Sequence, residues 1–216
     1  MEKEELKTLA QNLANPQGEK GIEIGEMMNA TNIGMTLESI RTLLIEDDER
    51  ILEIGHGNAG HVKSLIHLAT NLKYTGIDIS ETMYTEARRI NKDFESQADF
   101  ILYDGMELPF EDGSFDKIFT VNTVYFWKDP AAFLNEIYRV LKDDGTFVLT
   151  FAQKDFMEKL PFTAYDFTLY NNSDMEELIS KSHFKRMKTS EKEEQIKSKT
   201  GDETIQRIYT VLTIKK

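Results

Sequence analysis

Apolar and polar positions form two alternating patterns along the middle of this chain. Short apolar runs alternate with longer segments in which apolar side chains return every three or four residues. The first pattern is typical of buried strands, and the second is typical of helices that pack one face against a sheet. The runs that predict strands are 50–54, 74–79, 100–103, 117–121 and 146–151. The stripes that predict helices are 59–70, 83–94 behind an N-cap at Ser80, and 133–141.

Both ends of the chain depart from this alternation. Residues 1–46 look helical, with breaks predicted around 15–18 and 29–32. Near the other end, the pattern predicts a helix over 173–182 with an N-cap at Ser173. Two polar strands follow at 185–197 and 203–214, with Gly201-Asp202 at the turn, and such a pair must run antiparallel.

The order of these elements predicts the fold class. Strands that alternate with helices at this spacing imply right-handed crossovers and a parallel sheet with helices on both faces. We therefore expect an α/β fold: a doubly wound, Rossmann-like, mostly parallel sheet with an antiparallel C-terminal hairpin and an N-terminal helical cover. The cover is expected at 1–46 and the sheet with its helices at 47–216, together forming one compact domain.

Composition and charge narrow the classes of function. The formal net charge of −12 disfavours a nucleic-acid partner, because that binding needs Lys and Arg to neutralise phosphates. The chain has no cysteine, and no spacing of His, Asp and Glu indicates a metal site. No apolar run approaches the roughly 20 residues that span a bilayer, and the charged N-terminus lacks a signal-peptide core. We expect a cytoplasmic protein that binds neither nucleic acid nor membrane.

Candidate chemistry lies where the predicted strands end, because ligands of parallel sheets bind at the carboxyl ends of the strands. The residues at these ends are 53–57, Asp78, Asp104 and Asn122. Their side chains should therefore meet at one edge of the sheet.

The loop after the first strand contains Gly55, Gly57 and Gly60, the G-x-G-x-x-G spacing that cradles a dinucleotide pyrophosphate. Glu53 stands at its mouth and would repel a pyrophosphate, by about 1 kcal/mol in water at about 4 Å. S-adenosylmethionine instead presents an ammonium and a sulfonium at this depth, so Glu53 favours that cofactor over NAD. Asp78 can accept the ribose hydroxyls of either ligand and does not discriminate.

Four segments resemble the motifs of a known family, and they occur in the same order and at the same spacing as in that family. They are ILEIGHGNAG (51–60), YTGIDIS (74–80), YDGMELPFEDGSFDKIFTVN (103–122) and EIYRVLKDDGTFVLTF (136–151). Residues 50–151 resemble the class I S-adenosylmethionine-dependent methyltransferases, in particular the small-molecule group that includes ubiquinone- and menaquinone-biosynthesis-type enzymes. The N-terminal helices look similar to the substrate-side helices of that family.

The resemblance implies a set of cofactor-binding residues. Glu53 and the loop from Gly55 to Gly57 would hold the methionine portion, and Asp78 would bind the ribose. The adenine would lie against Ile79, Met83, Asp104, Gly105 and Met106. Asn122 would lie under the sulfonium. Two positions depart from the family pattern: Ala59 replaces a frequent third glycine, for which Gly60 could compensate, and Asp143-Asp144-Gly145 replaces a proline-glycine. We expect binding to survive both departures.

The acceptor of the methyl group should be a small, partly apolar molecule. Aromatic residues follow the fourth and fifth strands, and we expect Tyr125, Trp127 and Tyr165 to contact it. No catalytic constellation is visible; Tyr125 and His56 are candidate general bases, and His61 is interpreted as a loop residue. The alternatives are an NAD(P)-dependent oxidoreductase and an S-adenosylmethionine-binding protein without turnover. Neither the methylated atom nor the oligomeric state follows from the sequence.

Overall fold

The computed structural model describes residues 2–197 and 204–216. Within them, seven strands form one sheet in the order β3-β2-β1-β4-β5-β7-β6. The strands are β1 Arg50–Ile54, β2 Lys73–Asp78, β3 Ala98–Leu102, β4 Phe115–Val121, β5 Leu141–Ala152, β6 Arg186–Lys197 and β7 Thr204–Lys215. The first five pair in parallel, whereas β7 is antiparallel to both β5 and β6. The predicted fold class is confirmed, and the predicted turn at Gly201-Asp202 lies outside the described residues.

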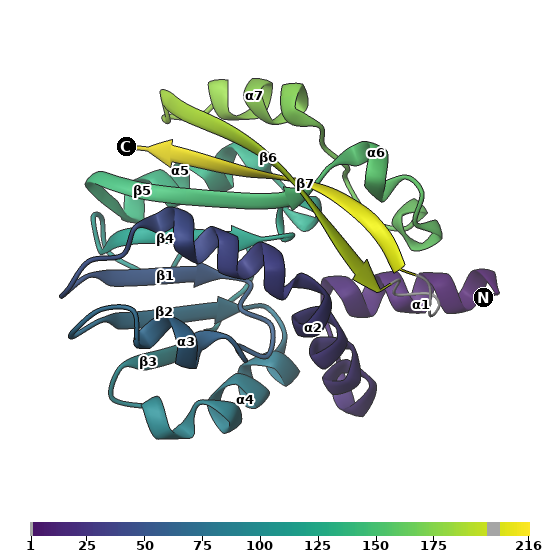
Figure 1. Cartoon of the computed structure of the whole chain (residues 1–216), viewed down its shortest axis with the longest axis horizontal. Helices are drawn as coiled ribbons and strands as arrows, with labels where there is room; N and C mark the ends of the chain where they lie inside the picture. The colour runs from purple at the N-terminus through teal and green to yellow at the C-terminus, as the bar shows by residue number, and fades with distance from the viewer. Residues whose placement is uncertain (1, 198–203) are drawn as a thin grey trace.

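Helices cover both faces of the sheet (Figure 1). The α-helices are α1 Lys3–Ala14, α2 Gly18–Leu43, α3 Val62–Ile66, α4 Glu81–Ile90, α5 Pro130–Val140, α6 Lys154–Met157 and α7 Asn172–Ser180. Three 3-10 helices are described as well: η1 Lys92–Phe94, η2 Val124–Phe126 and η3 Pro161–Ala164. Helix α1 lies beyond the carboxyl ends of the parallel strands (Figure 1).

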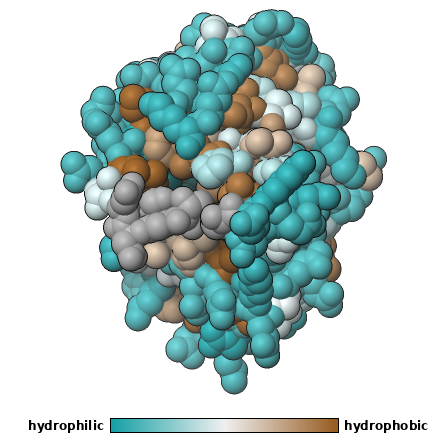
Figure 2. Space-filling model, turned by 90° about the vertical axis from the view of Figure 1, so that its right-hand side faces the viewer, coloured by the Kyte–Doolittle hydropathy of each residue, from teal (hydrophilic) through white to brown (hydrophobic). Residues whose placement is uncertain are grey.

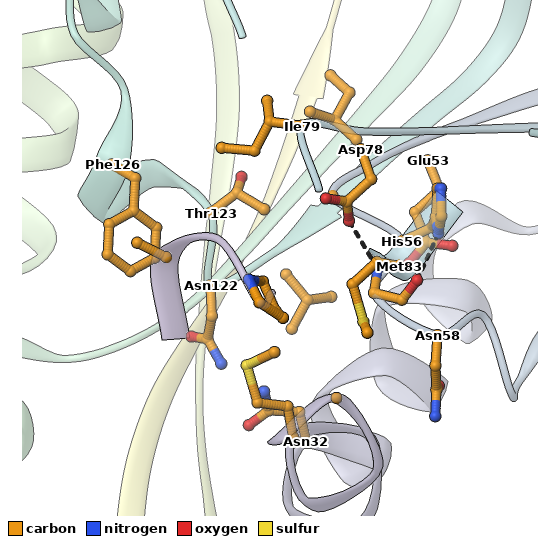
Figure 3. Close-up of a pocket in the computed structure, with 18 of the residues that line it drawn as sticks. Asn32, Glu53, His56, Asn58, Asp78, Ile79, Met83, Asn122, Thr123 and Phe126 are labelled. Carbon is orange, nitrogen blue, oxygen red and sulfur yellow. Dashed lines mark hydrogen bonds between the residues drawn. The ribbon is translucent and has the colours of Figure 1, made fainter. Parts of the chain in front are cut away.

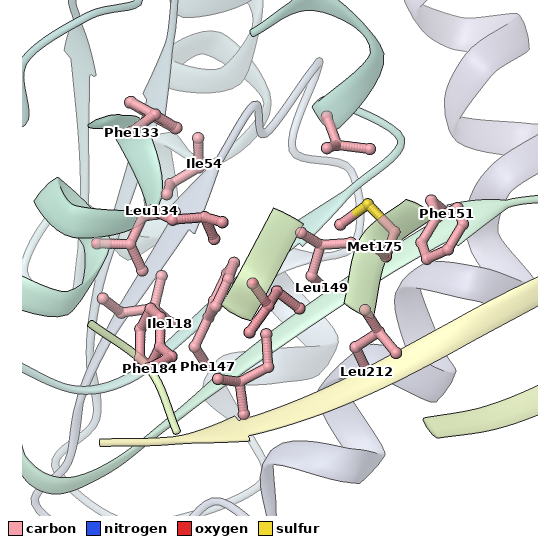
Figure 4. Packing of buried hydrophobic residues seen from close by; sticks show 14 of the residues in the cluster. Ile54, Ile118, Phe133, Leu134, Phe147, Leu149, Phe151, Met175, Phe184 and Leu212 are labelled. Carbon is pink, nitrogen blue, oxygen red and sulfur yellow. The ribbon is translucent and has the colours of Figure 1, made fainter. Parts of the chain in front are cut away.

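Two apolar clusters fill the spaces between the sheet and its helices. One cluster joins the sheet to α5 and α7, where Phe147, Phe151 and Phe184 are fully enclosed (Figure 4). The other joins the opposite face to α3, α4 and the second half of α2, through Met35 and Leu43 among others. Helix α2 is therefore both part of the core and part of the N-terminal cover.

The structure corrects several predicted boundaries. No break occurs at 29–32, because α2 runs continuously through this segment. Its polar side chains are satisfied in place: Thr31 Oγ1 donates to the Met27 carbonyl, and Asn32 Oδ1 accepts from Arg207. The helix predicted at 59–70 shortens to α3.

The helix caps give one confirmation and one correction. Ser80 caps α4 as predicted, since its Oγ accepts from the Met83 backbone N–H at 3.1 Å. Helix α7 begins one residue earlier than the sequence pattern predicts. Its N-cap is Asn171 rather than Ser173, and Asn171 forms a capping box with Asp174.

Candidate functional site

The larger of two neighbouring cavities opens at the carboxyl ends of β1, β2 and β4, beneath α2 (Figure 3). Figure 3 shows Asp78 and Met83 on one side of it and Asn122 and Phe126 on the other. Most of the residues predicted to bind the cofactor line this cavity: Glu53, Gly55, Gly57, Asp78, Ile79, Met83, Gly105 and Asn122. Trp127, which was predicted to contact the acceptor, lines this cavity and not the smaller one.

The glycine loop takes a shape that only glycine adopts without strain. Gly55 has φ +76°, and a Cβ there would lie 2.3 Å from Thr123 Cγ2. Gly57 has φ +55°, and nothing lies within 4 Å of a Cβ placed on it. The first glycine thus permits close packing of the loop on the sheet, and the second leaves open space for a ligand.

Ala59 occupies the position of the family's third glycine and adopts the glycine-like conformation itself, with φ +53°. Its side chain is fully buried, and its N–H donates to the His56 carbonyl at 3.0 Å. Gly60 has no positive φ, so Gly60 does not compensate for the substitution as the sequence led us to expect. The loop keeps its turn because alanine accepts a left-handed conformation there, at a cost of about 1–2 kcal/mol.

Glu53 is buried at the end of β1 and is held by two partners. Its Oε2 accepts from Tyr74 Oη at 2.5 Å and pairs with His61 Nε2 at 2.7 Å. Burial, and then the charge of Glu53, raise the pKa of Tyr74 well above its ordinary value, so this phenol remains a donor. Within the described residues no hydrogen bond reaches Oε1. The fixed carboxylate can thus offer Oε1 to a cationic group in the cavity.

His61 has a different role from the one that the sequence indicated. It is buried against Glu53 and lines the cavity, instead of being an unengaged loop residue. The sequence gives little signal for this contact, because a histidine beside a glycine loop has no distinctive spacing.

Asp78 connects the second strand to the glycine loop. Its Oδ2 accepts from the Gly57 N–H at 3.0 Å and its Oδ1 from the Ser80 N–H at 2.9 Å. Burial raises the pKa of this carboxyl, and the two backbone donors and nearby His56 oppose that rise. Each oxygen keeps a further lone pair that a ligand hydroxyl can use.

Three predicted residues lie outside the walls of both cavities: Asp104, Met106 and Tyr165. Asp104 is exposed, and its Oδ1 caps the backbone N–H groups of Met106 and Glu107. These bonds lower the pKa of Asp104. Tyr165 packs in the apolar cluster between α1 and η3.

A smaller cavity adjoins the larger one, and five residues line both: Leu13, Met28, Asn32, Asn122 and Phe126. Its walls are mainly apolar and come from η2, from the segment after β5, from α1 and α2, and from the β6–β7 hairpin. The aromatic members are Tyr125, Phe126, Phe156, Phe162 and Phe167. The two aromatic segments therefore share one apolar cavity.

The candidate bases have limited freedom to act. Burial raises the pKa of Tyr125 far above that of an ordinary phenol, and its hydroxyl lies 2.8 Å from the Ala152 carbonyl, to which it donates. His56 Nδ1 lies 2.6 Å from the Gly57 carbonyl and must donate to it, while Nε2 is enclosed without a partner among the described residues. Tyr125 is therefore not set up to take a proton from an acceptor, whereas His56, whose Nε2 lone pair is free, stays a candidate base.

Arg207 is a residue of the smaller cavity that the sequence did not single out. It is only 2% exposed, and its guanidinium bonds to Glu194 on β6 and to Thr31 and Asn32 on α2. Asn32 and Tyr103, which line the larger cavity, were missed as well. An arginine in a polar strand resembles any solvent-exposed residue until the hairpin folds over α2.

Comparisons with known proteins agree with this geometry. Residues 52–149 match the family described as "Methyltransferase domain". YrhH of Bacillus subtilis, which is named as a methyltransferase, is 32% identical over 111 residues, covering 51% of this chain and 62% of that protein. A fatty-acid O-methyltransferase of Mycolicibacterium smegmatis is 30% identical over 107 residues, covering 50% and 38%. The chain thus spans less than two thirds of the length of these relatives.

Solved structures match over nearly the whole chain. Phosphoethanolamine N-methyltransferase 2 of Haemonchus contortus, in complex with S-adenosyl-L-methionine, has a TM-score of 0.71 at 19% identity and covers 96% of this chain and 60% of its own. A SAM-dependent methyltransferase of Aquifex aeolicus has a TM-score of 0.64 at 16% identity and covers 96% and 98%. At such identities these matches establish the fold.

Proposed function

We propose that this chain, which belongs to the class I S-adenosylmethionine-dependent methyltransferases, transfers a methyl group to a small, partly apolar acceptor. The larger cavity would hold the cofactor, and the smaller cavity the acceptor. The observation that carries this proposal is that the two cavities share a wall at Asn32, Asn122 and Phe126.

The residues of the larger cavity fit the chemistry of S-adenosylmethionine. Glu53 lines this cavity and its Oε1 has no partner within the described residues, so it suits an ammonium. Asp78 suits ribose hydroxyls, and the space above Gly57 admits a ligand close to the backbone. When bound, the cofactor supplies a methyl group activated by a sulfonium. Ile79 and Met83 offer apolar contacts for a flat base, whereas the role of Asp104 remains a prediction.

The protein's contribution to such a transfer is mainly position and alignment, because the sulfonium is already a good leaving group. Asn122 is held between the two cavities: its Oδ1 accepts from the Ala152 N–H at 3.1 Å. The enclosing walls keep water from the reacting atoms. Because the cofactor would supply the activated methyl group and the protein its alignment, methyl transfer does not require a visible acid–base pair.

A small-molecule acceptor is supported by three observations. The smaller cavity is apolar and enclosed by aromatic rings. The net charge of −12 would repel a phosphate backbone. Two relatives, the fatty-acid O-methyltransferase and a 27-O-demethylrifamycin SV methyltransferase of Amycolatopsis mediterranei, carry the names of small acceptors.

Transfer of a labelled methyl group tests this proposal. The full chain is incubated with labelled S-adenosylmethionine and a cell extract, which is then separated by size. We expect the label in the small-molecule fraction. Label found only in macromolecules would contradict the small acceptor, and no label at all would favour a binding protein without turnover.

A further inference from the structure

The smaller cavity lacks a group that could remove a proton from an acceptor. Among the described residues that line it, none is an aspartate, glutamate, histidine or lysine. Its one phenol, Tyr125, already donates its hydroxyl and has a raised pKa because it is buried. The described walls therefore favour an acceptor that arrives as a nucleophile needing no base.

The polar groups of the smaller cavity that remain available are donors. Asn122 uses its Oδ1 to accept from the Ala152 N–H at 3.1 Å, which also fixes the orientation of its amide. Its Nδ2 meets only the weak acceptor Met35 Sδ, at 3.5 Å. Asn32 uses its Oδ1 to accept from Arg207 at 2.8 Å. Within the described residues, no oxygen accepts from the Nδ2 of Asn32.

Among the described residues that line this cavity, Arg207 is the one with a charged side chain. Arg207 lines it, whereas its ion-pair partner Glu194, whose Oε1 lies 2.6 Å from Arg207 Nη2, does not. The guanidinium lowers the pKa of Tyr125, although burial raises it more.

We propose that the acceptor is an apolar carboxylic acid, bound as its carboxylate against the amide donors of Asn32 and Asn122 and the guanidinium of Arg207. This inference rests on the proposed function, because it needs the cofactor in the larger cavity. Oxygen acceptors of a carboxylate match the free donors. The apolar walls would enclose the remainder of the molecule.

The reaction then balances without a proton. A lone pair of the carboxylate oxygen forms the new bond to the methyl carbon, and the carbon–sulfur bond breaks with its electron pair remaining on sulfur. An anion and a sulfonium give a neutral methyl ester and a neutral thioether. Carboxyl groups ionise near pH 4, whereas phenols and amines have pKa values of about 10 and would need a base. An ammonium would also be repelled by Arg207.

Matched acceptors of one chain length test this inference. Methyl transfer by the full chain is measured with octanoate, 1-octanol and octylamine, and binding of S-adenosylhomocysteine is measured in parallel by calorimetry. We expect methyl octanoate as the product, formed at least about tenfold faster than either other product. Faster transfer to the alcohol or the amine would overturn the inference. So would no transfer to octanoate while S-adenosylhomocysteine still binds. Loss of S-adenosylhomocysteine binding would contradict the proposed function itself.

A charge variant tests the location of the carboxylate. Asn32→Asp removes the amide donor and places a negative charge at the shared wall, so the KM for octanoate should rise about tenfold, or about 1.4 kcal/mol. Ala30→Asp is the matched control: it adds the same charge at an exposed position of α2 outside both cavities. S-adenosylhomocysteine binding reports that each variant is folded. An equal KM for octanoate in both variants would contradict the assignment.

Discussion

Individual side chains at this site are positioned by partners that a sequence does not display. Glu53 could be predicted at the mouth of the glycine loop, because it directly precedes the motif. Its partners Tyr74 and His61 could not, since the contact depends on how β2 and the loop pack. The same holds for Asn32 and Arg207, which are far apart in the chain and meet only when the hairpin crosses α2.

The charge of Glu53 can be tested with two ligands, of which only one carries an amino-acid portion. Glu53→Gln should weaken binding of S-adenosylhomocysteine about tenfold, or about 1.4 kcal/mol, because the ammonium loses its charged acceptor. Binding of 5′-methylthioadenosine, which has no ammonium, should change little in the same calorimetric titrations. Glu49→Gln is the control: Glu49 precedes the same strand and pairs with Lys117. Equal weakening of both ligands would show that Glu53 acts on the fold and not on the ammonium.

At the scale of helices and strands, the local sequence pattern predicted the type of each element better than the residues at which it begins and ends. The buried strands were recognised because a run of apolar residues bounded by turn residues has few other interpretations. Helix α2 was interrupted in the prediction because Asn and Thr are weak helix formers, and tertiary bonds overrode that preference. The cap of α7 was displaced by two residues because Asn171 and Ser173 are both good caps, and only the bond from the Asp174 N–H distinguishes them.

The glycine loop gives a prediction at this scale. Gly55→Ala should lower the free energy of unfolding by about 2 kcal/mol, since it combines a positive φ with a clash against Thr123 Cγ2. Thr123→Ser removes that methyl group and keeps the hydroxyl that bonds to Thr120. In the Thr123→Ser background the alanine should therefore cost less, by about 1 kcal/mol in urea unfolding. An identical cost in both backgrounds would contradict the predicted close contact.

At the scale of the whole molecule, the site lies on the face of the protein beyond the carboxyl ends of the parallel strands. No helix within the described residues is long and apolar enough to cross a membrane. Figure 2 shows the face beyond the carboxyl ends of the strands, where apolar residues gather among hydrophilic surroundings. The parallel sheet and the position of the cavities at the carboxyl ends of its strands follow from the alternation of strands and helices, and so could be predicted. The hairpin's share of the smaller cavity could not, because nothing in the sequence indicates that Ile196, Ile205 and Arg207 lie beside α1 and α2.

The identity of the cofactor is the central claim, and calorimetry of the full chain tests it most directly. S-adenosylhomocysteine and NADH are titrated separately into the same preparation. We predict that S-adenosylhomocysteine binds with a Kd in the micromolar range, about −8 kcal/mol, and that NADH binds more weakly because Glu53 repels its pyrophosphate. Binding of NADH without binding of S-adenosylhomocysteine would contradict the account.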